Sequence, residues 1–404
     1  MSALSPSAGG DRAERPAVLH YSHHSVGLGH LVRSLSVAEG LGGRFRVVLC
    51  SGGEVPAGLR LPPGVELIQL APIGAGPDGR LASMDPALTL AQAWDRRRAR
   101  LESLYAELRP VAIVVELFPF GRAKFARELE PLLEAARRDE RRPRVISSVR
   151  DLLVTAKRDQ QGHDDLAADR LRRWFHAVIV HADERFARLE ETFRPSRPPA
   201  TPVLYSGFVA PGGELRRAAP RTPPEVLVTS GGGRTGAPLL RAAAEAHRLA
   251  FHPRGLRTRL VTGPFMSEAE VRSLRAIAGD REGLSVERFV PDLASEMAGA
   301  AVSVSRCGYN TTIDLLRARV PSVVVPYDEG RENEQSERAR RLAKLGAVSV
   351  LASDLLTPER LAERVLAILE AQPPRLALDL CGASRTARIV AELVAGGLPV
   401  RRAA

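Results

Sequence analysis

The chain of 404 residues lacks the features of disulfide-rich and membrane-spanning proteins. Its three cysteines, Cys50, Cys307 and Cys381, are odd in number and far apart, which excludes a disulfide framework and favours a reducing compartment. No apolar run approaches the roughly 20 residues that span a bilayer. Residues 1–15 are polar and lack the apolar core of a signal peptide. We therefore expect a cytoplasmic protein.

Lysine and aromatic residues are also scarce. Of the 58 basic residues, only Lys124, Lys157 and Lys344 are lysine, and aromatic residues make up 4% of the chain. The formal net charge is +11, and a positive field favours anionic ligands such as nucleotides and phosphates. No stretch interleaves aromatic and basic residues as single-strand-binding proteins do. We expect no nucleic-acid partner.

Short apolar runs that alternate with helical patterns fill both halves of the chain. Continuous β-branched runs indicate strands that are buried on both faces, as in a parallel sheet. The strands expected in the first half are Val18–Tyr21, Arg46–Leu49, Val111–Val115, Val145–Ser148 and Ala177–Val180. Those expected in the second half are Val226–Thr229, Arg259–Thr262, Ser285–Phe289, Ala301–Ser305, Ser322–Val325 and Val348–Leu351.

A proline-rich segment separates the two halves. Repeated βαβ units on either side of it predict an α/β protein of two doubly wound, Rossmann-like domains that face each other across a cleft. We assign residues 1–207 to the first domain, with a possible short strand at Val203–Val209. Residues 208–224 form the linker, 225–381 the second domain, and 382–404 a C-terminal helix and tail that could pack on either domain.

A Gly-x-Gly turn lies between the first expected strand and its helix, in SHHSVGLGHLVRS. Gly27 and Gly29 would let a ligand approach the backbone closely. His30 stands at the helix start, at the carboxyl end of a strand, where it would point into the cleft. A surface histidine in a tight turn is the alternative. For His23 and His24 we favour a packed or solvated role.

A glycine-rich turn follows the first strand of the second half. Ser230, Gly231, Gly232 and Gly233 would present backbone N–H groups at the next helix N-terminus, which favours a bound phosphate. The turn is not a Walker loop, because Ala237 stands where that motif requires lysine. A merely flexible loop is the alternative.

Two further helix starts carry candidate ligands. Gly308 makes a turn before a helix that bears Asn310, Thr311 and Asp314. Thr311 and Asp314 are three residues apart and share a helix face, and a carboxylate there could accept hydrogen bonds from a ribose diol. A later helix starts at Glu334. The alternative is that Asp314 and Glu334 only complement helix dipoles.

Two stretches resemble glycosyltransferase family 28: GLGHLVRSL near the N-terminus and SRCGYNTTIDLL…PYDEGRENEQSERARRL near the C-terminus. HHSVGLGH and ELFPFGR are similar to a branch of predicted bacterial glycosyltransferases in that family. The resemblance is strongest over 226–350. It implies a GT-B fold and inverting transfer of a sugar from a nucleotide-diphosphate sugar, with uridine as the expected base. The acceptor would be a hydroxyl on a small or lipid-linked molecule.

The resemblance also implies roles for residues of the second domain. The Ser230–Gly233 turn would hold the diphosphate, and Asp314, where the family usually has glutamate, the ribose. The remaining donor contacts would be the base-framing pair Phe289 and Val290, the donor-sugar pair Glu334 and Gln335, and Gly308, Asn310 and Thr311. No Asp-x-Asp occurs in the chain. We therefore expect no metal and no cofactor, with positive charge from Arg234 and Arg306.

His30 matches the family's proposed general-base or acceptor-side position. Glu116 and Asp151 each follow an expected strand, so either could orient His30 or act as the base. A structural cap or an ion pair is the alternative for both. The three candidates for catalysis are therefore His30, Glu116 and Asp151.

Residues 88–108 form a helical pattern with Leu90, Trp94, Leu101 and Leu108 on one face and Arg96, Arg97, Arg98 and Arg100 beside it. Such a helix could touch an anionic membrane. We favour a core-facing helix with a solvated arginine side, so peripheral membrane contact stays open but is not favoured.

Two other functions remain open at this point. A nucleotide-sugar 2-epimerase would share the fold, but its GTRPE-like and DSGGxQEE-like motifs are missing. A non-catalytic nucleotide-sugar-binding subunit is the second rival. Epimerisation needs no acceptor, transfer needs one, and a binding subunit does neither.

Overall fold

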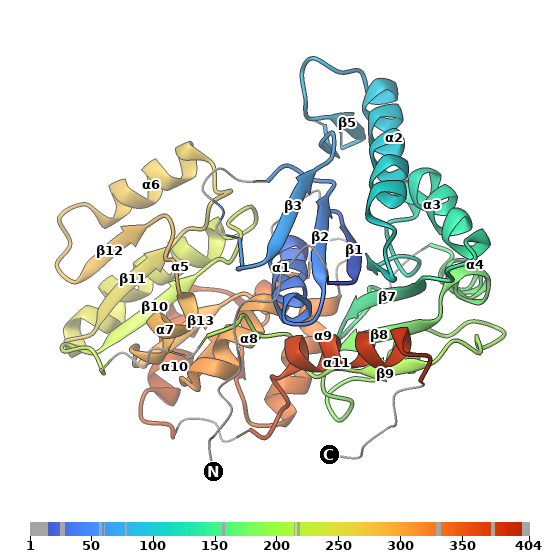
Figure 1. The fold of residues 1–404 in the computed structure, drawn as a ribbon. Helices are drawn as coiled ribbons and strands as arrows, with labels where there is room; N and C mark the ends of the chain where they lie inside the picture. The colour runs from blue at the N-terminus through green and yellow to red at the C-terminus, as the bar shows by residue number, and fades with distance from the viewer. Residues whose placement is uncertain are drawn as a thin grey trace, which may run out of the picture.

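The computed structural model describes residues 15–24, 29–55, 59, 61–76, 79–155, 158–213, 215, 219–328, 333–372 and 376–397. Two parallel sheets carry the fold (Figure 1). Their strand orders are β3-β2-β1-β6-β7-β8-β9 and β12-β11-β10-β13-β14-β15. In each sheet the order reverses beside the first strand of the sheet, which is where doubly wound folds bind ligands at the carboxyl ends of their strands. The predicted fold class of two Rossmann-like domains is confirmed.

The first domain contains the seven-stranded sheet. Its central strands are mostly apolar and are buried along their whole length, as the continuous runs predicted. The strands are β1 (Ala17–Ser22), β2 (Arg46–Ser51), β3 (Val65–Gln69), β6 (Ala112–Glu116), β7 (Arg144–Arg150), β8 (Ala177–His181) and β9 (Val203–Tyr205), with an antiparallel hairpin of β4 (Ile73–Ala75) and β5 (Leu81–Ser83). The helices are α1 (Gly29–Gly42), α2 (Leu90–Leu108), α3 (Ala126–Arg138) and α4 (Gln160–Trp174).

The second domain repeats the pattern with six strands. Each of the five strands before β15 falls within two residues of an expected run. The strands are β10 (Glu225–Thr229), β11 (Arg257–Val261), β12 (Leu284–Glu287), β13 (Val302–Ser305), β14 (Ser322–Val324) and β15 (Ser349–Val350). The helices are α5 (Ala237–Ala246), α6 (Glu268–Ala278), α7 (Leu293–Ala298), α8 (Tyr309–Ala318), α9 (Glu334–Lys344) and α10 (Pro358–Ile368).

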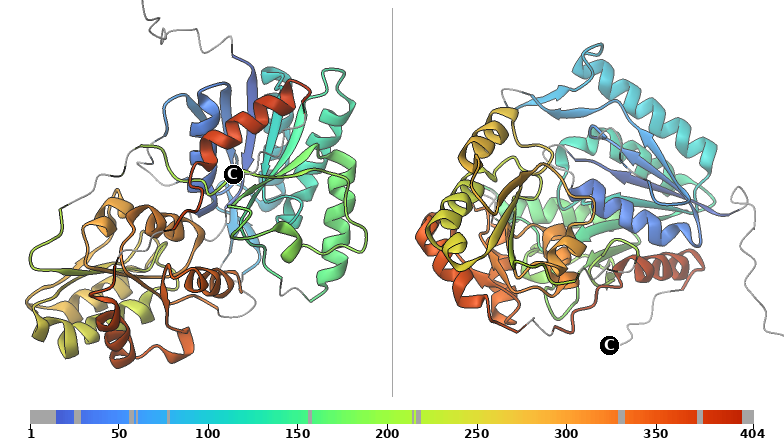
Figure 2. Two further views of the ribbon diagram at one scale, coloured as in Figure 1. Left: turned by 90° about the horizontal axis from the view of Figure 1, so that it is seen from below. Right: turned by 90° about the vertical axis from the view of Figure 1, so that its left-hand side faces the viewer.

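The last helix, α11 (Gly382–Val394), returns to the first domain and lies beside α1 (Figure 2). The two helices pack so closely that a Cβ at Gly40 would lie 2.4 Å from the carbonyl oxygen of Ala383. Val209 and Cys381 form a β-bridge where the chain crosses between the domains in both directions. The proposed domain boundaries stay a prediction, which limited proteolysis between Pro211 and Pro224 can check.

Helix α2 begins with a capping box in which Thr89 and Gln92 bond each other's backbone. Trp94 and Leu101 are buried in the core of the first domain, so the helix faces the core. Arg97, however, is not on a solvated side, because its side chain is wholly buried. Among the described residues, no helix is both long and apolar enough to cross a membrane.

Candidate active site

The first helix and the sheet bring two of the predicted catalytic residues together. His30 lies in the first turn of α1, and Glu116 ends β6. The Nδ1 atom of His30 is 2.6 Å from Oε1 of Glu116. Arg33, one turn further along α1, donates to the same oxygen. The Glu116 side chain is 1% exposed and that of His30 is 21% exposed, so the imidazole is the only one of the two groups that solvent reaches.

Burial and the neighbouring charges together set the protonation states of His30 and Glu116. Burial lowers the pKa of His30 to about 4, although the Glu116 carboxylate acts to raise it. Burial alone would raise the pKa of Glu116, but His30 and Arg33 hold the pKa of that carboxyl well below its usual range. At neutral pH, Glu116 is therefore ionised and His30 neutral. The hydrogen bond assigns the proton to Nδ1, which leaves a lone pair on Nε2.

The cluster also touches the second domain. The guanidinium carbon of Arg33 lies 5.1 Å from the centre of the Tyr309 ring in α8. The Tyr309 hydroxyl donates to the carbonyl oxygen of His181 over 2.8 Å and accepts from the N–H of Val209 over 3.1 Å. Next to it, Asn310 donates to the carbonyl oxygen of Gly29 over 3.1 Å. The start of α8 thus lies against the start of α1. Gly27 lies outside the described residues.

The glycine-rich turn after β10 is folded tightly. Gly231 and Gly233 have φ of 67° and 99°, which only glycine adopts freely. A Cβ at Gly233 would lie 2.6 Å from the carbonyl oxygen of Thr262, and one at Gly231 would lie 3.7 Å from Oγ1 of Thr311. Ser230 donates to the carbonyl oxygen of Thr262 over 2.5 Å. The turn therefore sits beside the first turn of α8.

Helix starts α5 and α8 both lie at this turn. Gly236 and Gly308 are their N-cap residues, and neither helix start has a side-chain cap. The N–H groups of these first turns thus lack the usual side-chain acceptor, a condition that favours anions. A Cβ at Gly308 would meet no atom within 4 Å, so space is open beside it.

The two arginines expected to supply charge differ from each other. Arg306 is 6% exposed, and it donates to the carbonyl oxygens of Thr235 over 2.8 Å and Val325 over 3.1 Å. Arg306 therefore stabilises the end of the glycine-rich segment through hydrogen bonds to the backbone. Arg234 is exposed, with its guanidinium carbon 5.2 Å from the centre of the Phe265 ring.

The residues predicted to contact the base and the ribose differ in how exposed they are. Phe289 follows β12 and is 64% exposed, unusually open for a phenyl ring, whereas its neighbour Val290 is buried. Asp314 is half-buried on α8 and has no hydrogen bond to a described residue. Burial raises the pKa of Asp314 to about 7, against the effect of Arg317 and with that of Asp292. Such a carboxyl group is available to a hydroxyl-bearing ligand.

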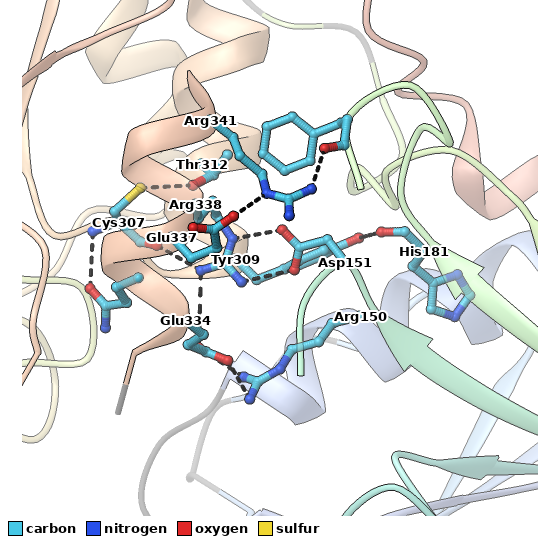
Figure 3. Close-up of polar contacts among 12 residues, drawn as sticks. Arg150, Asp151, His181, Cys307, Tyr309, Thr312, Glu334, Glu337, Arg338 and Arg341 are labelled. Carbon is cyan, nitrogen blue, oxygen red and sulfur yellow. Dashed lines mark hydrogen bonds and ion pairs between the residues drawn. The ribbon is translucent and has the colours of Figure 1, made fainter. Parts of the chain in front are cut away.

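The predicted donor-sugar pair begins α9, and its two side chains contact different domains; Figure 3 shows Glu334 with Arg150. Gln335 turns to its own domain, where Oε1 accepts from the N–H groups of Cys307 over 3.1 Å and Tyr327 over 3.2 Å. Glu334 turns to the first domain, where Nη1 of Arg150 donates to Oε1 over 2.9 Å and Nη2 forms an ion pair with Oε2. The side chain of Glu334 is 9% exposed.

Asp151 does not join His30. Its two oxygens accept from Nε of Arg338 over 2.7 Å and from Nη2 over 2.8 Å, and both side chains are wholly buried. Arg338 also donates to the carbonyl oxygen of Cys307 over 2.8 Å (Figure 3). This is the ion-pair alternative raised for Asp151, and it joins the two domains.

The sequence interpretation missed Arg33 and Arg338. A signal for Arg33 was available, because it follows His30 by three residues and shares its helix face. No comparable signal marks Arg338, because its partner Asp151 lies 187 residues away.

Comparison with known proteins extends these observations. Residues 226–391 match the glycosyltransferase family 28 C-terminal domain. The chain is 27% identical over 371 residues to the UDP-N-acetylglucosamine–N-acetylmuramyl-(pentapeptide) pyrophosphoryl-undecaprenol N-acetylglucosamine transferase of Methylorubrum populi, covering 90% of this chain and 91% of that protein. It is 33% identical over 186 residues to the transferase of the same name from Hahella chejuensis, covering 46% and 49% of the two chains.

Solved structures agree in fold. The calicheamicin glycosyltransferase CalG4 superposes with a TM-score of 0.57 at 18% identity, covering 96% of each chain. Acinetobacter baumannii MurG superposes with a TM-score of 0.54 at 16% identity, covering 94% of this chain and 98% of that one. Two parallel-sheet domains, the family match and relatives named as transferases agree with one another. The protein is a glycosyltransferase with a GT-B fold, and its residues 226–391 match the C-terminal domain of family 28.

Proposed function

We propose that the protein transfers a sugar, with inversion and without a metal ion, from a UDP-sugar to an acceptor hydroxyl. The observation that carries this proposal is the contact between the starts of α1 and α8. Asn310 bonds the carbonyl oxygen of Gly29, the residue before His30, while Thr311 lies beside Gly231 of the glycine-rich turn. A base and a diphosphate cradle therefore lie on either side of one helix start. The relatives' names specify UDP-N-acetylglucosamine as donor.

The proposed reaction is a single displacement. Nε2 of His30 takes the proton of the acceptor hydroxyl. At the same time the oxygen of that hydroxyl forms a bond to the anomeric carbon, and the bond between this carbon and the diphosphate oxygen breaks. The reacting carbon passes through an oxocarbenium-like state. Because the acceptor attacks opposite the leaving group and no enzyme nucleophile intervenes, the configuration at the anomeric carbon inverts.

Glu116 acts on this step through His30. Its carboxylate holds the Nδ1–H of His30, which fixes the tautomer and orientation of the ring and stabilises the imidazolium that forms. Arg33 fixes the carboxylate in turn. We therefore assign Glu116 and Arg33 as positioning residues. Asp151, held by Arg338, takes no part in proton transfer in this proposal.

The leaving diphosphate is received by backbone N–H groups of the glycine-rich turn and of the α8 start. Such preorganised donors stabilise developing charge without reorganising. Within the described residues, no three His, Cys, Asp or Glu side chains are grouped as a metal site requires. The groups that we propose for the diphosphate are N–H groups and the exposed Arg234, and the proposed reaction uses no metal ion and no cofactor.

The nucleoside is held by the second domain. Asp314 accepts hydrogen bonds from the ribose hydroxyls, and the exposed ring of Phe289 packs on the base above Val290. Glu334 and Gln335 contact the donor sugar. The acceptor is a small or lipid-linked hydroxyl compound, and the names of the relatives contain a lipid-linked one, a pyrophosphoryl-undecaprenol. Nucleic acid and a membrane surface have no part in the proposal.

The experiment is a nucleotide-sugar screen in the presence of a chelator. We expect UDP-N-acetylglucosamine to raise the melting temperature more than its guanosine and thymidine counterparts, because a ligand of the folded state stabilises it. We expect turnover of this donor only as transfer or slow hydrolysis. Epimerised UDP-sugar without acceptor would instead identify an epimerase, and binding without any turnover would identify a binding subunit. Activity that needs added magnesium or manganese would contradict the metal-free mechanism.

A further inference from the structure

The loop that follows β7 in the first domain reaches the start of α9 in the second. Arg150 and Asp151 are consecutive, while Glu334 and Arg338 are four residues apart on α9. Arg150 pairs with Glu334, and Asp151 pairs with Arg338. One residue before Glu334, Asn333 donates to Oγ1 of Thr155 over 2.9 Å. The first turn of α9 is thus held by the 150–155 loop of the other domain (Figure 3).

We propose that Arg150 is a positioning residue for the donor sugar, so that the acceptor-side domain supplies part of the donor-sugar subsite. The inference rests on the proposed contact between Glu334 and the sugar. It adds a residue from the other domain to that contact and predicts that nucleotide-sugar binding, but not nucleotide binding, depends on it.

The geometry of the pair supports this role. Arg150 is 14% exposed, and its two terminal nitrogens each contact a different oxygen of Glu334. A two-pronged contact fixes the plane of the carboxylate. Oε2 of Glu334 accepts no hydrogen bond from a described residue, and Oε1 has a second lone pair, so the carboxylate can still accept hydroxyl hydrogens while Arg150 holds it. Vicinal hydroxyls of a sugar are suitable donors.

A competing partner makes Arg150 necessary. Nη1 of Arg338 lies 4.0 Å from Oε1 of Glu334, one helical turn along α9. Without Arg150, the buried Glu334 carboxylate would lose its main counter-charge, a costly state. It would then turn towards Arg338 and away from the position set by the first domain. Removing Arg150 should therefore disturb the sugar subsite and leave the nucleotide subsite on β10 and α8 intact.

The test compares two dissociation constants for each variant: that of UDP and that of UDP-N-acetylglucosamine, both by calorimetry on the full chain. In Arg150→Met we expect UDP affinity within about twofold of wild type and a roughly ten- to hundred-fold loss for the nucleotide sugar, the usual effect of losing a charge-assisted hydrogen bond. Arg150→Lys should fall between the two, because a single ammonium cannot fix both oxygens.

Arg341→Met is the matched control. Arg341 lies two turns further along α9, is 15% exposed, and also pairs across the domains, with Glu191. It donates as well to the carbonyl oxygen of Phe186 over 2.8 Å. If these pairs only hold the domains together, Arg341→Met and Arg150→Met should change the two affinities alike. We expect only Arg150→Met to change their ratio.

The outcomes separate this inference from the proposed function. The ratio in question is the affinity for UDP-N-acetylglucosamine divided by the affinity for UDP. If this ratio is unchanged in Arg150→Met and Arg150→Lys but lowered in Glu334→Gln, the role of Arg150 is overturned and the sugar contact still stands. An unchanged ratio in Glu334→Gln would overturn the sugar contact itself. No binding of either ligand by wild type would overturn the proposed donor. Intact UDP binding in each variant shows that it is folded.

Discussion

The first domain contains two buried clusters of arginine and glutamate, on opposite faces of one sheet. They differ in how many of their buried polar atoms have a hydrogen-bond partner. In one, Arg97 donates to both oxygens of Glu128 and to the carbonyl oxygens of Gly52 and Ala71. The Tyr21 hydroxyl completes it by donating to Glu128. Both charged side chains are at most 1% exposed. Every polar group has a partner, and no atom is left for a substrate.

The cluster of Arg33, Glu116 and His30 is incomplete. Oε2 of Glu116 and Nε of Arg33 are buried without a hydrogen-bond partner in the described part of the chain. Unlike Glu128, the Glu116 carboxylate connects to the surface through a partly exposed imidazole. A buried ion pair alone therefore does not mark an active site. We propose that an under-satisfied pair which holds an accessible base marks it here.

The largest expected effect is on turnover in His30→Ala. Transfer should slow by about 10²–10⁴-fold, the usual share of a general base, while UDP affinity stays within about twofold. Glu116→Gln should also slow transfer, because it loses the charge that stabilises the imidazolium. Single-turnover rates at saturating donor measure both. Normal rates in His30→Ala with a collapse in Asp151→Asn would move the base to Asp151.

The second effect is on stability in Arg97→Met. This variant leaves Glu128 buried without its partner, so the free energy of unfolding should fall by about 3–5 kcal/mol. The turnover of the protein that remains folded should be unchanged. Urea denaturation and single-turnover assays measure the two quantities. A loss of turnover without a loss of stability would make the sealed cluster functional and break the comparison.

A smaller effect is expected for nucleotide binding in Asp314→Asn. Loss of a charge-assisted bond to the ribose should weaken UDP affinity about ten- to hundred-fold. The 2′-deoxy nucleotide should show little difference between wild type and variant. Because hydroxyl donors favour the ionised carboxyl, wild-type UDP affinity should also fall as the pH drops below about 7, the raised pKa of Asp314. Equal affinities for both ligands and both proteins would leave Asp314 as a helix residue only.

The smallest effect is a shift in the pH profile of turnover. His30 must be neutral to act as a base, and its pKa is lowered to about 4. At saturating donor, the rate should therefore hold down to about pH 4–5 and fall below it. Burial is the main cause of the lowered pKa, and Arg33 contributes, so Arg33→Met should move the acid limb to higher pH. An acid limb near 6.5 in wild type would show an ordinary, solvated histidine.

The strands at the centre of each sheet were predictable because they are apolar on both faces. Edge strand β3 was not, because Glu66 and Gln69 interrupt its apolar run and Val65 is its only buried residue. The sequence also could not decide where α11 packs, since that depends on a close approach at Gly40. His30, Glu116 and the glycine-rich turn were identified because each follows a strand. The ion pairs between the two domains, such as Asp151 with Arg338, could not be predicted, because they depend on how the domains are placed relative to each other.

The most direct test of the account is an early-time proton NMR measurement of the sugar released from UDP-N-acetylglucosamine by the wild-type enzyme and by His30→Ala, with excess chelator and water as the acceptor. The donor is α-linked, so an inverting enzyme releases the β anomer first. We predict β-N-acetylglucosamine from the wild type and a rate at least 10²-fold lower from His30→Ala. Initial release of the α anomer, or equal rates from the two proteins, would contradict the inverting, His30-assisted mechanism.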